Sequence, residues 1–115
     1  MQDTFYKVRN LTVEQKKAVC DDAKTLATEW WVDVLNCKVS WSRKRVDMPY
    51  NEIMSKLTNG CHFVVIHRRY DEPDRDYGEI GFSTMTLGSD YFLWIHITVD
   101  DLNKIVQKHQ LEAMS

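Results

Sequence analysis

Three consecutive segments between residues 62 and 98 constrain the fold of this chain most strongly. Residues 62–69 are apolar and β-branched, residues 79–87 alternate apolar with small or polar side chains, and residues 91–98 are aromatic and β-branched throughout. Such patterns are typical of strands. The connections between the segments are short and contain Asp, Pro or Gly, which favours pairing of each strand with the next. This region therefore predicts an antiparallel meander of three strands.

A long helix is predicted before this meander, over residues 13–36. Thr12 and Gln15 form a capping box at its start, and apolar residues such as Val19, Ala23 and Val34 then recur at helical spacing. Charged side chains occupy the other side, as expected for a helix that packs one face on a core. At this spacing Trp30 and Trp31 both belong to the helix.

Shorter elements complete the predicted fold. We expect strands at 4–8 and 38–46, the second as an edge strand or extended arm, and a short helix from residue 50 that ends at Asn59-Gly60. Thr98, with Asp101 three residues later, caps a C-terminal helix. The predicted fold is one α+β domain over residues 1–115. It has a mostly antiparallel sheet of four or five strands, with the long first helix and the C-terminal helix on one face.

Composition limits the classes of function. The net charge of −2 provides no overall attraction for nucleic acid or an anionic membrane. A basic, apolar leader and an apolar run of about 20 residues are both missing from the sequence, so we expect a cytoplasmic protein with no membrane partner. Cys20, Cys37 and Cys61 are widely spaced, unlike zinc ligands, and are expected to be reduced core residues. Neither a metal nor a cofactor is predicted.

Aromatic and charged residues are the candidates for binding another protein. Adjacent helical positions are about 100° apart, so one of Trp30 and Trp31 is expected near the surface. Tryptophan and arginine are enriched where proteins bind one another. The predicted contact residues are Trp30, Trp31, Trp41, Arg43, Lys44 and Arg45, together with the acidic loop residues Asp71, Glu72, Asp74 and Asp76. A homodimer would also account for surface aromatics.

Two alternative hypotheses use other residues. The first is nucleic-acid binding, in which basic and aromatic side chains contact phosphates and stack on bases; its residues are Trp41, Arg43, Lys44, Arg45, Arg68 and Arg69. The second is a small hydrolase in which His67 and His96 converge on one pocket for acid–base chemistry. His62 has the opposite parity to His67, so one regular strand cannot direct both to the same site.

Known enzyme signatures are incomplete or missing in this sequence. The order of elements is similar to the first half of acetyltransferases of the GNAT superfamily, which hold acyl-CoA at a [QR]-x-x-G-x-[GA] turn after the fourth strand. Residues 99–104 occupy that position here, and they are acidic and lack glycine. An acidic helix start repels phosphate. A P-loop, a dinucleotide fingerprint, a G-x-S-x-G elbow and an H-E-x-x-H motif are also missing from the sequence.

The sequence as a whole favours a small non-enzymatic module that binds another protein. Inhibitors, adaptors and host-modulating accessory proteins, including those encoded by phages or mobile elements, are the functional types we expect. No family is assigned.

Overall fold

The chain folds around a single antiparallel sheet of six strands in the order β1-β4-β5-β6-β2-β3. The structure is a computed structural model and describes residues 2–36, 41–84 and 90–114. Its elements are β1 (Thr4–Phe5), α1 (Val13–Thr25), β2 (Glu29–Leu35), β3 (Arg43–Val46), α2 (Tyr50–Met54), β4 (His62–Arg68), the 3₁₀ turn η1 (Pro73–Arg75), β5 (Tyr77–Ser83), β6 (Asp90–Ile97) and α3 (Val99–Lys108). Among the described helices, none is both long and apolar enough to span a bilayer.

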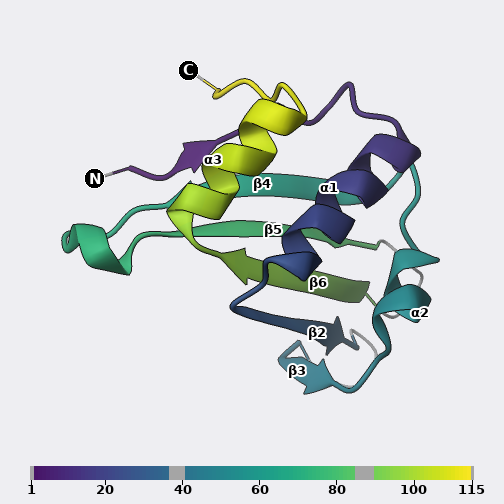
Figure 1. The fold of residues 1–115 in the computed structure, drawn as a ribbon. Coiled ribbons are helices and arrows are strands. Elements are labelled where there is room, and N and C mark those ends of the chain that lie inside the picture. The colour runs from purple at the N-terminus through teal and green to yellow at the C-terminus, as the bar shows by residue number, and fades with distance from the viewer. Residues whose placement is uncertain (1, 37–40, 85–89, 115) are drawn as a thin grey trace.

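The helices and the sheet form two layers. Helices α1 and α3 lie side by side across one face of the sheet (Figure 1). The short helix α2 belongs to the same layer, because Ile53 is fully buried in the same core. In the part of the chain that the structure describes, the other face of the sheet carries no helix, and we call it the helix-free face.

The core lies between these two layers because strand and helix periodicities meet there. Alternate residues of the central strands, such as Ile80, Leu93 and Ile95, point toward the helices and are fully buried. On the helix side they meet residues such as Ala23 of α1 and Leu102 of α3, which are also fully buried. Each element therefore buries one side, and the intervening strand residues point to the helix-free face.

The predicted meander and both helix starts are observed. Strands β4, β5 and β6 pair consecutively and antiparallel, with Val65 opposite Ile80 and Ile80 opposite Ile95. The capping box of Thr12 and Gln15 opens α1, and Thr98 accepts a hydrogen bond from the Asp101 N–H at the start of α3. These local signals depend on residues three apart, which explains why they could be identified from the sequence.

The predicted long helix over 13–36 is wrong. Helix α1 ends at Thr25, and residues 29–35 form strand β2. Trp30 and Val34 are four residues apart and fit a helix, but Trp30, Val32 and Val34 also alternate as a strand requires. Pairing of β2 with both β6 and β3 decides between the two patterns, because it satisfies the backbone with many hydrogen bonds at once.

The sheet therefore has six strands rather than the four or five predicted. Strand β2 is the additional one, and it lies between β6 and β3. The first strand is shorter than predicted, since β1 covers Thr4–Phe5 and Tyr6 forms only an isolated bridge with Ala113. Helix α2 ends at Met54, so Gly60 does not cap it. The part of the predicted strand 38–46 before residue 41 lies outside the described residues.

Candidate functional site

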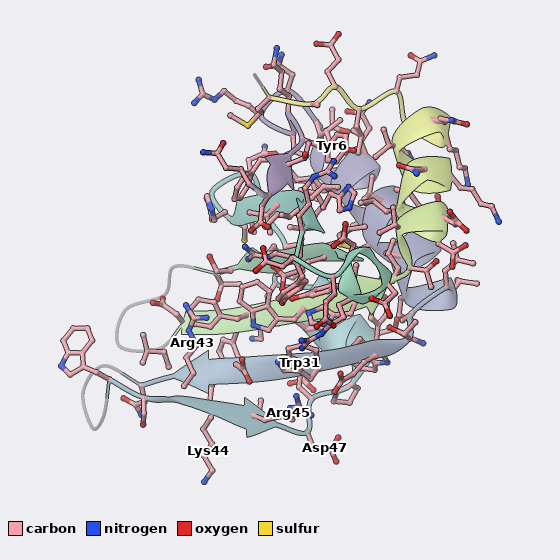
Figure 2. The ribbon with its side chains drawn as sticks, turned by 90° about the vertical axis from the view of Figure 1, so that its left-hand side faces the viewer. Tyr6, Trp31, Arg43, Lys44, Arg45 and Asp47 are labelled. Atoms are coloured by element: carbon pink, nitrogen blue, oxygen red, sulfur yellow. The ribbon has the colours of Figure 1, made fainter. Side chains whose placement is uncertain are left out.

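Two cations and three aromatic rings from neighbouring strands gather on the helix-free face. We call these residues the aromatic–arginine cluster: Trp31 of β2, Arg43 and Arg45 of β3, and Phe92 and Trp94 of β6. The guanidinium carbon of Arg43 lies 4.0 Å from the centre of the Phe92 ring and 5.7 Å from that of Trp94. That of Arg45 lies 4.7 Å from the Trp31 ring (Figure 2). Both distances to the nearest ring are within the range of cation–π contacts.

Strand register explains why these side chains meet. Trp31 is opposite Trp94, and Asp33 is opposite both Phe92 and Arg45. Residues directly opposite in an antiparallel pair point to the same face, so every cluster side chain projects from the helix-free face. Phe92 is 9% exposed, and Trp31 and Trp94 are half-buried. The rings thus form a surface held in place by its packing, and the two exposed arginines lie over it.

The aromatic surface continues beyond the cluster. His96 packs against Trp31 with ring centres 4.6 Å apart, and against Tyr77 at 4.5 Å. Tyr77 in turn stacks on Tyr70 at 5.9 Å. This row crosses β2, β6 and β5 and ends at Tyr70, which is 40% exposed. The helix-free face therefore presents a continuous band of rings.

A buried carboxylate lies beside this band. Glu79 of β5 accepts hydrogen bonds from Nε and Nη2 of Arg68 at 3.1 and 2.8 Å, and its Oε1 lies 3.1 Å from Nε2 of His96. Burial raises the pKa of Glu79, but the hydrogen bonds from His96 and Arg68 outweigh it, so the pKa lies below its ordinary value. Both carboxylate oxygens are thus occupied, which suits a structural role.

The two histidines of the hydrolase hypothesis do not converge. His67 is opposite Gly78, whose side faces Leu102 of α3, whereas His96 is opposite Glu79 on the helix-free face. Nε2 of His67 instead lies 3.3 Å from Oδ2 of Asp76. A shared pocket for acid–base chemistry is therefore excluded. Groups of three His, Cys, Asp or Glu side chains suitable for a metal ion do not occur among the described residues.

The acidic loop residues do not join the cluster. Asp71, Glu72 and Asp74 are exposed around η1, which links β4 to β5. By strand register, Arg43 is level with Leu35 and Asp90, at the opposite end of the sheet. Figure 1 shows the β4–β5 connection extending away from the sheet. Asp76 is half-buried and accepts a hydrogen bond from the Tyr70 N–H. This bond, followed by His67, lowers the pKa of Asp76. The four acids thus form no single surface with the predicted cations.

The remaining predicted contact residues divide between separate places. Trp30 points to the helix side, where its ring meets Tyr50 edge-on at 5.8 Å. Trp41 precedes β3 and is 81% exposed. Lys44 lies between the two cluster arginines in sequence but points away from the sheet (Figure 2).

The nucleic-acid residues are also separated. Arg68 belongs to the Glu79 network, and its Nη1 donates to Asp3 at 2.8 Å. The N–H of Arg69 also donates to Asp3, while its guanidinium donates to Thr4. Both arginines lie at the β1 side of the sheet, whereas Arg43 and Arg45 lie at the opposite edge.

Sequence reasoning missed Phe92 and Trp94. Residues 91–98 are aromatic and β-branched throughout, so the sequence pattern alone singles out none of them as a protein contact. The signal that could have identified them is the alternation of side chains along the strand. Leu93 and Ile95 are fully buried on the helix side, so Phe92 and Trp94 point to the opposite face. Without β2 as a strand, the sequence offered no neighbour that could bring Arg43 and Arg45 to them.

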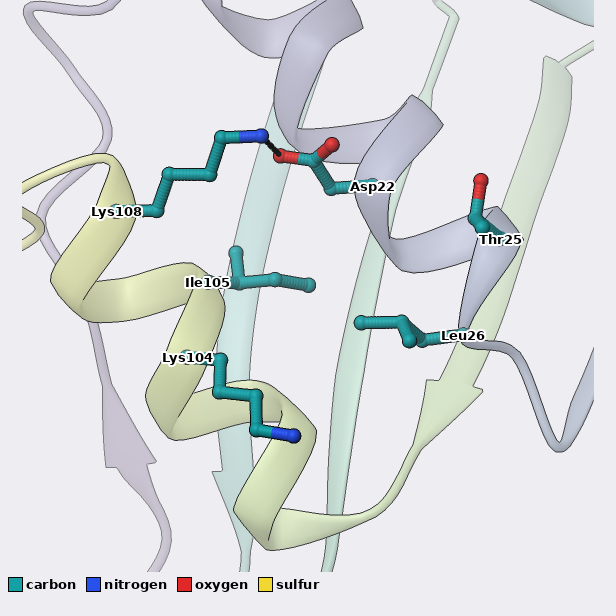
Figure 3. Close-up of a pocket in the computed structure, with 6 residues that line it drawn as sticks. All are labelled: Asp22, Thr25, Leu26, Lys104, Ile105 and Lys108. Carbon is teal, nitrogen blue, oxygen red and sulfur yellow. Dashed lines mark ion pairs between the residues drawn. The ribbon is translucent and has the colours of Figure 1, made fainter.

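One pocket, of about 270 Å³, lies between α1 and α3 (Figure 3). It is lined by Asp22, Thr25, Leu26, Lys104, Ile105 and Lys108. Oδ2 of Asp22 is already shared by Nζ of Lys108 at 2.9 Å and Nε2 of His109 at 2.7 Å. The charges on this side of the pocket therefore serve to join the two helices.

The cysteines give no reactive centre among the described residues. Cys20 and Cys61 are buried and unpaired, and burial raises the pKa of the Cys20 thiol far above its ordinary value. Cys37 lies outside the described residues. Comparison of the chain with protein-family models, curated proteins and solved structures gave no match.

Proposed function

We propose that this protein is a non-enzymatic module that binds another protein through the aromatic–arginine cluster. The observation that carries the proposal is the stacking of Arg43 and Arg45 on rings of the sheet face that bears no helix among the described residues. We expect the module to be an inhibitor, an adaptor or a host-modulating accessory protein, including one encoded by a phage or a mobile element. The buried, unpaired thiols of Cys20 and Cys61 suit the reducing cytoplasm.

The chemistry of the cluster suits a protein interface. Tryptophan and arginine are the residue types that most often dominate the binding energy between proteins. A guanidinium that stacks on a ring has already lost part of its side-chain freedom, so less entropy is lost when a partner binds. The half-buried rings of Trp31 and Trp94 can cover apolar partner surface, and the edges of the guanidinium groups can donate hydrogen bonds.

A protein partner is favoured over nucleic acid. Glu29 and Asp33 lie on the same face as the cluster, and Glu29 forms an ion pair with Arg45 at 3.6 Å. These carboxylates oppose the close approach of phosphates. Arg68 and Arg69, which the nucleic-acid hypothesis required, are held at the other side of the sheet by Asp3. These contacts therefore disfavour nucleic acid as the partner.

The test is capture of a partner by the immobilised chain, compared between two double variants of equal charge change. Arg43→Glu with Arg45→Glu alters the cluster, and Lys17→Glu with Lys104→Glu alters exposed cations of α1 and α3. We expect the cluster variant to weaken capture about tenfold or more, as for interface arginines. The control variant should bind like the parent chain.

Three results would contradict the proposal. The parent chain could capture no protein, both double variants could bind equally well, or nuclease could release the captured material. The third result would indicate that nucleic acid is the partner. Circular dichroism of each variant shows whether loss of capture reflects loss of folding.

A further inference from the structure

The two edge strands of the sheet, β1 and β3, differ in how far other parts of the chain cover them. At the β1 edge, the C-terminal residues pair with the strand: the N–H of Lys7 donates to the Glu112 carbonyl, and the N–H of Met114 donates to the Phe5 carbonyl, both at 2.7 Å. At the other edge, β3 pairs with β2 alone, and within the described residues no segment covers its outer side. The outer backbone groups of β3 are thus available to another strand.

The open edge carries three consecutive cations. Arg43 and Arg45 project on the helix-free face, and Lys44 points away from the sheet between them (Figure 2). All three residues are exposed. Neither Arg43 nor Lys44 has an ion pair with a residue that the structure describes, whereas Arg45 has only the long contact with Glu29. A strand added here would meet positive charge on both of its sides.

We propose that the outer edge of β3 binds an extended acidic segment of the protein partner as a seventh strand of the sheet. This inference depends on the proposed function and specifies the partner's chemistry. Backbone hydrogen bonds would supply affinity, and opposite charges on directly opposed residues would set the register. Carboxylates opposite Arg43 and Arg45 would meet guanidinium groups that are already oriented by the rings beneath them.

The same charges argue against a second copy of this chain at the edge. An antiparallel continuation of the sheet by an identical strand, with the two-fold axis at Arg43, Lys44 or Arg45, would place that cation opposite its own copy. Like charges directly opposite one another destabilise strand pairing. A basic strand is disfavoured for the same reason, so the edge selects for acidic segments.

The probe for this inference is a short peptide titrated into the full chain. Acetyl-Val-Glu-Asp-Glu-Val-Thr-amide provides three consecutive acids, and its binding is followed by the fluorescence of the chain's tryptophans. Two further peptides carry N-methyl groups on alternate amides. One is methylated on the odd-numbered amides and the other on the even-numbered amides. Because alternate amides of a paired strand face its neighbour, strand addition requires that one methylated peptide loses binding while the other retains it.

Two measurements on the chain complete the test. Lys44→Glu should weaken binding of the unmodified peptide roughly fivefold or more, which corresponds to the upper end of the energy of a cross-strand charge pair. Lys17→Glu should leave binding of this peptide unchanged. Amide hydrogen exchange should slow at those residues of β3 whose N–H groups point away from β2. Lys44 lies outside the aromatic–arginine cluster, so this variant tests the edge rather than the rings.

Several results would overturn the inference. The unmodified peptide could fail to bind, or both methylated peptides could bind equally well. Oligothymidine at a similar concentration could also displace the peptide. If the peptide fails while a captured protein still depends on Arg43 and Arg45, the acidic strand is wrong and the proposed function stands. If capture also fails, both are wrong.

Discussion

At the scale of single residues, Glu79 places a carboxylate in the middle of the sheet on the helix-free face. Glu79 is only 6% exposed, yet one carboxylate oxygen forms an ion pair with Arg68 and the other lies beside the ring of His96. A buried charge is tolerated only where such partners compensate for the loss of water. Glu79 thereby links β4, β5 and β6 beside the aromatic band.

Replacement of Glu79 by Gln should lower the free energy of unfolding by about 1–3 kcal/mol at neutral pH, since hydrogen bonds to a charged group are lost. The pKa of Glu79 is lower in the folded chain than its ordinary value of 4.5. Its stabilisation is therefore fully present above pH 4.5 and disappears as the pH falls through the folded-state pKa. Urea unfolding of both chains between pH 3 and pH 7 measures this difference.

The matched control for Glu79 is Glu72→Gln, because Glu72 is exposed beside η1. This variant should follow the parent chain closely at every pH. A gap between the parent and Glu79→Gln that stayed constant down to pH 3 would show that the carboxylate charge does not contribute to stability.

At the scale of elements, the approach of β5 to β6 depends on Gly81. A Cβ placed on Gly81 would lie within contact distance of the Leu93 backbone, closer than atoms normally approach. Because the obstacle is backbone rather than a flexible side chain, the two strands would have to separate. This pair forms the centre of the sheet, and it carries Phe92 and Trp94 on the helix-free face.

Gly81→Ala should therefore destabilise the fold by about 1–3 kcal/mol, the usual cost of overpacking. Gly60→Ala is the matched control, since a Cβ there has only Thr58 Oγ1 nearby at 3.8 Å. That variant should be unchanged or stabilised by up to about 1 kcal/mol, because alanine restricts the unfolded chain. Thermal unfolding compares the two, and equal melting temperatures would contradict the close approach.

At the scale of the whole molecule, the C-terminal segment closes one sheet edge and leaves the other open. Residues far apart in sequence form this closure, since Phe5 and Lys7 pair with Met114 and Glu112. Exposed strand edges invite unwanted pairing, so each edge needs some protection. The β1 edge is covered by chain, whereas the β3 edge is protected by charge.

A chain that ends at Leu111 should lose about 1–3 kcal/mol of stability, because two backbone hydrogen bonds disappear at about 0.5–1.5 kcal/mol each. Amide exchange in β4 should also accelerate, since its neighbour β1 is held less firmly. The double variant Glu112→Ala with Met114→Ala keeps both backbone bonds and should lose much less. Equal losses would show that the side chains, and not strand pairing, secure this edge.

Local signals in the sequence identified much of the fold. The capping box of Thr12, the cap at Thr98 and the three-strand meander each depend on neighbours a few residues apart. The segment 29–35 could not be decided in this way, because its apolar residues satisfy both a helical and a strand pattern. Pairing with β6, whose partner residues lie 55 to 67 positions later in the chain, resolved it.

For the candidate site, the sequence supplied the residue types but not their grouping. It identified Trp31, Arg43 and Arg45 as contacts for another protein, together with Trp30 and the acidic loop. Arg68 was grouped with Arg43 and Arg45 only in the nucleic-acid hypothesis. Which of these share a surface depends on strand order and register, and these are settled by hydrogen bonding across the whole sheet. The cluster arose where β3, β2 and β6 became neighbours.

By itself, the sequence determined the α+β class, the helix starts and the antiparallel meander, because periodicity and capping depend only on residues a few positions apart. Only the tertiary structure decided that residues 29–35 form a strand and that β3 lies at an open edge. It also decided that His67 and His96 lie on opposite faces. Long-range pairing makes these choices, since it satisfies backbone hydrogen bonds that no local pattern can assign.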